Sequence, residues 1–151
     1  MAKSVLLARP HPFIVNEMKP FLEQGGFIPI KLEKLANLPA NAAGLAGAII
    51  SLAVESSVPE SAETVFAELR RVTPRTPVLF AAMLSLAAMK GSLRRIAKGN
   101  AIEATILGVE PESKDHPDLG KPDTFLYFCN SDFAAPEKRA LAAALIKRHF
   151  R

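Results

Sequence analysis

Short apolar runs alternate with amphipathic stretches along the whole chain. Five runs are mostly apolar and lack the strict alternation of apolar and polar residues that a strand with one solvent-exposed face shows. They cover residues 4–8, 27–32, 46–50, 76–82 and 104–110. Such runs are typical of strands that are buried on both faces of a parallel sheet. We therefore predict five strands, the second of them near a sheet edge because Pro29 interrupts it.

Apolar residues recur at helical spacing between these runs. Ser57 and Glu60 stand at capping-box spacing before one such stretch, and Pro136 opens another. The pattern predicts helices over residues 13–24, 57–73, 86–98 and 136–150. Residues 34–43, which Pro39 interrupts, form either a weak helix or a loop. The alternation indicates one α/β domain over residues 1–151: a doubly wound, mostly parallel five-stranded sheet of flavodoxin-like class, with helices on both faces.

Two segments near the C-terminus leave the strand count open. Residues 111–122 are polar and rich in proline, which predicts a loop. Thr124–Cys129 is an aromatic run with high β-propensity. This run is either an extra strand or an extended return to the last helix.

The run at 46–50 lies in the middle of the alternation and ends at Ser51. Open α/β sheets collect ligands and chemistry at the carboxyl ends of their strands. We therefore predict that Ser51 and its neighbours form the functional centre.

Composition excludes several classes of protein. Apolar residues make up 49% of the 151 residues, which indicates a globular domain with a real core. No apolar stretch reaches the length of a membrane span. Cys129 is the only cysteine, so no internal disulfide can form and we expect a cytoplasmic protein. The net charge of +4 favours acidic partners without indicating nucleic acid.

The order of these elements resembles the receiver domain of bacterial response regulators. The match is closest over residues 46–82, where a buried strand, a proline-opened helix and the run Thr-Pro-Val-Leu-Phe-Ala-Ala follow one another. The first 27 residues and the last helix also fit. Residues 111–133 do not, because receivers pass from strand five to helix five within a few residues.

The resemblance implies a phosphorylation pocket in which every functional position is replaced. In receivers, acids after strand one hold Mg²⁺, an aspartate ending strand three accepts phosphoryl, a hydroxyl ends strand four and a lysine ends strand five. The matching positions of this chain are Ala8, Arg9, Ser51, Ala82 and Glu110. The resemblance thus implies a degenerate receiver that is not an enzyme and uses no metal or cofactor.

The fifth strand decides which residue stands at the lysine position. If it is 104–110, the position falls on Glu110, and Cys129 is the rival if it is 124–129. With the first choice, we predict that Arg9 and Glu110 approach each other across the pocket and replace the metal with an ion pair.

Cations follow one face of the predicted helix at 86–98. Lys90, Arg94 and Lys98 are four residues apart, and no acid stands between residues 86 and 98. Together with Lys147 and Arg148 of the last helix, they are candidates for binding an acidic protein partner. The plainer alternative is a solvated face. Aromatic residues are not interleaved with either set, so nucleic-acid binding is not favoured.

Two further candidates, a loop with four possible metal ligands and the single residue Ser51, each allow a functional and a purely structural interpretation. Asp115, His116, Asp118 and Asp123 could bind a divalent metal, but they match no known ligand spacing and suit a solvated loop. Ser51 could be a nucleophile, but it lacks the Gly-x-Ser-x-Gly elbow, so a hydroxyl bonded to the main chain is the simpler expectation.

The sequence therefore favours a non-phosphorylatable receiver-like signalling module that works by protein contact, as a single chain or a homodimer. The alternative is a small-molecule-binding protein or enzyme of flavodoxin-like fold. Such a protein would use the carboxyl edge near Arg9, His11, Ser51 and Glu55. A deep polar pocket at this edge would favour the alternative, and a filled edge would favour the signalling module.

Overall fold

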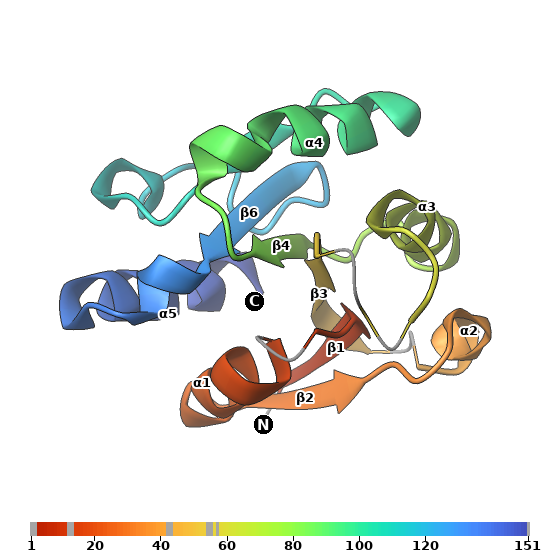
Figure 1. The fold of residues 1–151 in the computed structure, drawn as a ribbon, viewed down its shortest axis with the longest axis horizontal. Coiled ribbons are helices and arrows are strands. Elements are labelled where there is room, and N and C mark those ends of the chain that lie inside the picture. The colour runs from red at the N-terminus through yellow and green to blue at the C-terminus, as the bar shows by residue number, and fades with distance from the viewer. Residues whose placement is uncertain (1–2, 12–13, 42–43, 54–55, 57, 151) are drawn as a thin grey trace.

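A computed structural model describes residues 3–11, 14–41, 44–53, 56 and 58–150. Six parallel strands form one sheet in the order β2-β1-β3-β4-β6-β5. The strands are β1 (Lys3–Arg9), β2 (Phe27–Lys31), β3 (Leu45–Ser51), β4 (Val78–Ala82), β5 (Thr105–Leu107) and β6 (Thr124–Cys129), arranged as Figure 1 shows. The α/β class with a mostly parallel sheet is confirmed.

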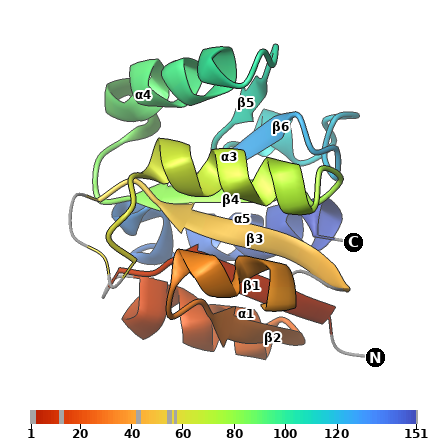
Figure 2. The same cartoon turned by 90° about the vertical axis from the view of Figure 1, so that its right-hand side faces the viewer.

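Helices cover both faces of the sheet (Figures 1 and 2). One face packs against α1 (Lys19–Gln24) and α5 (Pro136–His149). The other face packs against α2 (Leu38–Asn41), α3 (Ala62–Val72) and α4 (Leu86–Gly99). A π-helical segment and three 3₁₀ helices complete the described structure, at Ile14–Met18, Leu35–Asn37, Pro111–Ser113 and Asn130–Phe133. No helix in these described ranges is long and apolar enough to cross a membrane.

Burial on both faces explains why the strands lack alternation. In β1, Val5 and Leu7 enter the core under α1 and α5, while Leu6 and Ala8 enter the core under α2, α3 and α4. All four side chains are at most 1% exposed. Each face needs apolar residues, so the strand reads as a continuous apolar run.

Both candidate segments form strands, and the fifth position of the sheet belongs to β6 rather than to the strand within residues 104–110. β6 pairs with β4 along its whole length, from Val78 opposite Phe125 to Ala82 opposite Cys129. β5 is the extra strand and pairs with β6 at the sheet edge. All six residues of β6 are buried, whereas the three of β5 are half-buried. The full burial of β6 fits an interior strand, and the partial burial of β5 fits an edge strand.

Two helix starts also differ from the sequence prediction. α3 begins after Ser61, whose hydroxyl accepts a hydrogen bond from the Thr64 N–H at 3.2 Å. Ser57, the expected cap, lies outside the described residues. The expected helix at 13–24 consists of the π-helical segment and then α1, which has Pro20 in its first turn, where a missing N–H costs little.

Candidate functional site

Four strand ends meet at the carboxyl edge of the sheet. Strand register places Arg9 opposite Ile50, Ser51 opposite Ala81, and Ala82 opposite Cys129. Along this edge β1 therefore presents a guanidinium, β3 a hydroxyl, β4 a methyl group and β6 a thiol. These are the ends that carry the phosphorylation chemistry in the receivers that the sequence resembles.

Arg9 is the charged group buried at this edge, with only 4% of its surface exposed. Its Nε donates to the Glu60 carbonyl at 2.9 Å, and its Nη1 donates to the carbonyls of Ser51, at 2.8 Å, and Ala53. These three carbonyls lie at the end of β3 and on the way to α3. The guanidinium therefore fastens the β3–α3 connection to the end of β1.

Main-chain carbonyls suit a buried cation, because their dipoles replace part of the hydration that the guanidinium loses. Burial lowers the pKa of Arg9 from its ordinary value, yet an arginine stays protonated in proteins. Ser56 adds a second tie between the same two segments, because its hydroxyl donates to the Pro10 carbonyl and accepts from the Val58 N–H. The edge between β1 and β3 is therefore filled by a fixed positive charge.

Ser51 is 2% exposed, and its hydroxyl accepts a hydrogen bond from the Ala53 N–H at 3.1 Å. This contact is the main-chain bond that the simpler interpretation of Ser51 predicts. Ala8 and Ala82 are also buried and carry no polar group. These three positions hold no carboxylate.

Glu110 does not meet Arg9. It follows the edge strand β5 and is exposed, and β3, β4 and β6 lie between β5 and β1. Both residues are described, and no salt bridge joins them. The predicted ion pair is wrong because it assumed that residues 104–110 form the fifth strand of a receiver.

The lysine position falls instead at the end of β6, where sequence reasoning missed three contacts. The Cys129 N–H donates to the Asp132 carboxylate at 2.8 Å, and Lys138 lies 3.7 Å from the same carboxylate. The Tyr127 hydroxyl donates to the Leu84 carbonyl, and burial raises the pKa of this hydroxyl. A cavity of about 240 Å³ opens here, lined in part by Glu110.

The cations of α4 are exposed and form a single row, as their spacing predicts. Lys90, Arg94 and Lys98 have no acidic group within salt-bridge distance in the described ranges. Lys147 and Arg148 belong to α5 on the other face of the sheet. Arg148 already binds the Lys114 carbonyl at 2.8 Å and Asp115 at 3.2 Å. The two helices therefore present separate basic groups.

The carboxylates of residues 115–123 pair with cations. Asp118 lies 2.9 Å from Lys121 and accepts from the Thr105 hydroxyl at 3.0 Å, and these hydrogen bonds lower the pKa of Asp118. Asp123 lies 2.9 Å from Arg70. Among the residues that the structure describes, no group of three or more His, Cys, Asp or Glu side chains could hold a metal ion. The loop interpretation thus accounts for these carboxylates.

Comparisons with known proteins find likeness in structure only. No family model and no curated protein matches the sequence. Two solved receiver domains, from Sinorhizobium medicae and Clostridium thermocellum, each align at 14% identity with a TM-score of 0.53 over 97% of this chain; the alignments cover 97% and 96% of those chains. A protein from a study of streptococcal redox sensors that evolved from two-component response regulators aligns at 10% identity, with a TM-score of 0.56, over 99% of this chain and 53% of its own. The chain has the fold of a response regulator receiver domain.

Proposed function

We propose that this protein is a receiver-like signalling module that accepts no phosphate and acts by contact with another protein. The observation that carries the proposal is the buried Arg9 guanidinium between β1 and β3. In the family that the sequence resembles, acids at this place hold Mg²⁺. A fixed cation here repels a metal ion, and Ser51 cannot form an acyl phosphate.

Arg9 also explains how such a module would keep one conformation without phosphate. Its hydrogen bonds to the carbonyls of Ser51, Ala53 and Glu60 hold the β3–α3 connection against β1. The likeness to a redox sensor that evolved from response regulators supports the idea that this fold can be reused for another signal.

We expect acetyl phosphate with Mg²⁺ to leave the protein unmodified, as measured by intact-mass spectrometry with an active receiver domain as the positive control. The Ser51→Asp variant should also stay unmodified, because Arg9 would pair with the new carboxylate and exclude the metal. A phosphoryl adduct on the native protein would contradict the proposal. An adduct on the variant alone would show that the buried guanidinium does not block the pocket.

The row of cations on α4 is our candidate for the partner surface. Reversing Lys90, Arg94 and Lys98 to glutamate should abolish capture of the partner from a lysate of the source organism, with little change in melting temperature, because all three are exposed and unpaired among the described residues. The matched control reverses Lys31, Lys34 and Arg75, which are exposed cations elsewhere. Equal capture by both triple variants would refute this assignment.

A small-molecule site at the carboxyl edge is the second candidate, and the cavity at the end of β6 is the observation that favours it. Ser85, Glu110, Asp132 and Lys138 give this cavity polar groups of both signs. The alternative drawn from the sequence placed the site near Arg9 and His11, together with Glu55, which lies outside the described residues. Ligand-induced stabilisation that is lost on Lys138→Ala would support this second function.

A further inference from the structure

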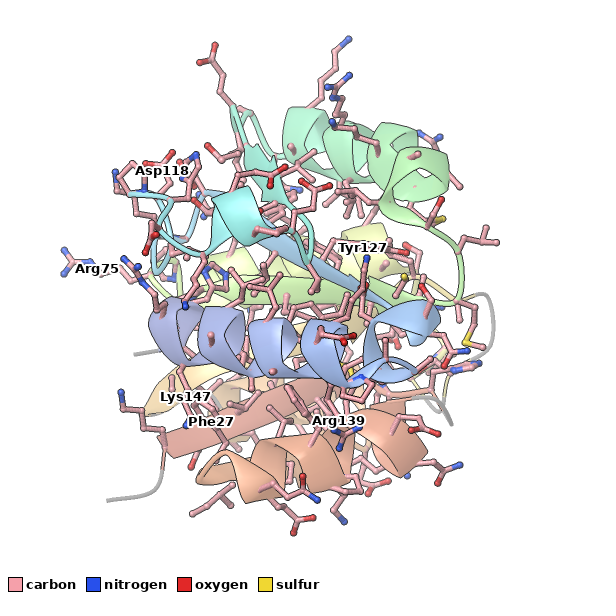
Figure 3. The ribbon with its side chains drawn as sticks, turned by 90° about the vertical axis from the view of Figure 1, so that its left-hand side faces the viewer. Phe27, Arg75, Asp118, Tyr127, Arg139 and Lys147 are labelled. Carbon is pink, nitrogen blue, oxygen red and sulfur yellow. The ribbon has the colours of Figure 1, made fainter. Side chains whose placement is uncertain are left out.

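A second candidate surface lies between α1 and α5. Residues of these two helices line a surface cavity of about 340 Å³, which we call the α1–α5 groove. Its lining includes Phe21, Gly25, Arg139, Ala140, Ile146 and Lys147. Figure 3 shows Arg139 and Lys147 in the space between α5 and α1, toward opposite ends of α5. The groove thus has an apolar floor and a cation at each end.

The two cations are available to a ligand. Arg139 and Lys147 have no acid within salt-bridge distance in the part of the chain that the structure describes. The lining holds no acidic side chain, although α1 carries Glu23 next to Gln24. The Arg139 guanidinium lies 5.4 Å from the centroid of the Phe21 ring and 5.9 Å from that of Phe133, and these cation–π contacts favour its position at this end of the groove.

The spacing of these cations sets the spacing of the groups that would pair with them. Arg139 and Lys147 are eight residues apart on one helix, which corresponds to about 12 Å at 1.5 Å per residue. On a bound helix, two carboxylates seven or eight residues apart have about the same separation. Ala140 and Ala143 are small, so an apolar side chain between those carboxylates can reach the floor.

We propose that the α1–α5 groove binds an acidic amphipathic helix of a partner protein. Two carboxylates on that helix pair with Arg139 and Lys147, and apolar residues between them contact Ala140 and Ile146. A second copy of this chain fits less well, because a two-fold interface would bring the same two cations against each other. The groove lies on the face of the sheet opposite α4, so this proposal does not depend on the cations of α4.

The test is selection from a displayed library of random peptides of about 16 residues, long enough to form a helix on binding. Enriched peptides should carry two acids seven or eight positions apart with apolar residues between them. Their affinity should fall about tenfold or more for the Arg139→Glu/Lys147→Glu variant and should weaken with added salt.

Two variants guard against an indirect effect of unfolding. Ala140→Glu adds a repelling carboxylate at an exposed position of the groove and should also lose binding. Lys34→Glu/Arg75→Glu makes the same change of charge at two exposed cations outside the lining of the groove and should keep binding. Enrichment of neutral or basic peptides, or equal binding to the Arg139→Glu/Lys147→Glu variant, would overturn the proposal. So would binding of a free fatty acid such as dodecanoate in place of any peptide, or self-association through this face in sedimentation experiments.

Discussion

Replacing Gly47 with alanine is expected to lower the free energy of unfolding by about 3 kcal/mol, at the upper end of the range for overpacked cores. A Cβ built on Gly47 would lie 2.1 Å from the ring of Phe150. Phe150 is fully buried and meets Phe27 edge-on, with ring centroids 6.3 Å apart. The Phe150 ring cannot move aside without leaving this core. Urea denaturation of Gly47→Ala should therefore show the whole expected decrease in the free energy of unfolding.

A double-mutant cycle tests whether this contact is the cause. Phe150→Ala alone should cost about 3–5 kcal/mol, but Gly47→Ala should add little once the ring is gone. Gly91→Ala is the matched control, because its Cβ meets nothing within 4 Å on an exposed face of α4. This control should stabilise the protein by up to about 1 kcal/mol. Additive losses in the double variant would rule out the contact.

The apolar runs predicted the strands well because burial on both faces leaves a local signal in the sequence. β1, β2, β3 and β4 lie where the runs of 4–8, 27–32, 46–50 and 76–82 placed them, and β2 is at an edge. Sheet order leaves no such signal. Residues 104–110 and 124–129 are both apolar, and only the packing against β4 separates an edge strand from an interior one.

The insertion between β5 and β6 accounts for the segment that did not fit a receiver. Val109 and Leu119 from this insertion join the core under α1 and α5. Composition predicted a solvated loop at 111–122, but Ser113 and Leu119 in this segment are buried. Burial is inferred from apolar residues that recur at helical or strand spacing, and a single apolar residue in a polar stretch shows no such recurrence.

Sequence reasoning found the unusual residue of the candidate site but not its partners. The end of the first strand placed Arg9 at the carboxyl edge of the sheet, where its guanidinium donates to the Ser51 carbonyl. Three of its partners are the main-chain carbonyls of Ser51, Ala53 and Glu60. Every residue possesses such a carbonyl, so no side-chain pattern could have identified these three partners. Matching the charge of Glu110 to Arg9 therefore gave the wrong pair.

Mild acid is expected to destabilise this protein through His149, by on the order of 3 kcal/mol between pH 6.5 and 4. His149 is fully buried at the end of α5. The Gly120 N–H donates to its Nδ1 at 3.0 Å, so Nε2 carries the proton and donates to the Val78 carbonyl at 2.9 Å. A second proton on Nδ1 would break the bond to Gly120. The neutral ring thus ties α5 to β4 and to the insertion.

The direction of the pH effect follows from the pKa of His149 in the folded and in the unfolded protein. Burial lowers the pKa of His149 from 6.5 to about 4 in the folded protein. The unfolded chain binds the proton below pH 6.5 and the folded protein does not, so stability is complete above that pH and is lost as the pH falls toward 4. Urea denaturation at several pH values measures this slope. His149→Gln should be less stable at pH 7 but lose less stability on acidification. Equal slopes in the native protein and the His149→Gln variant would show that this ring is not the source.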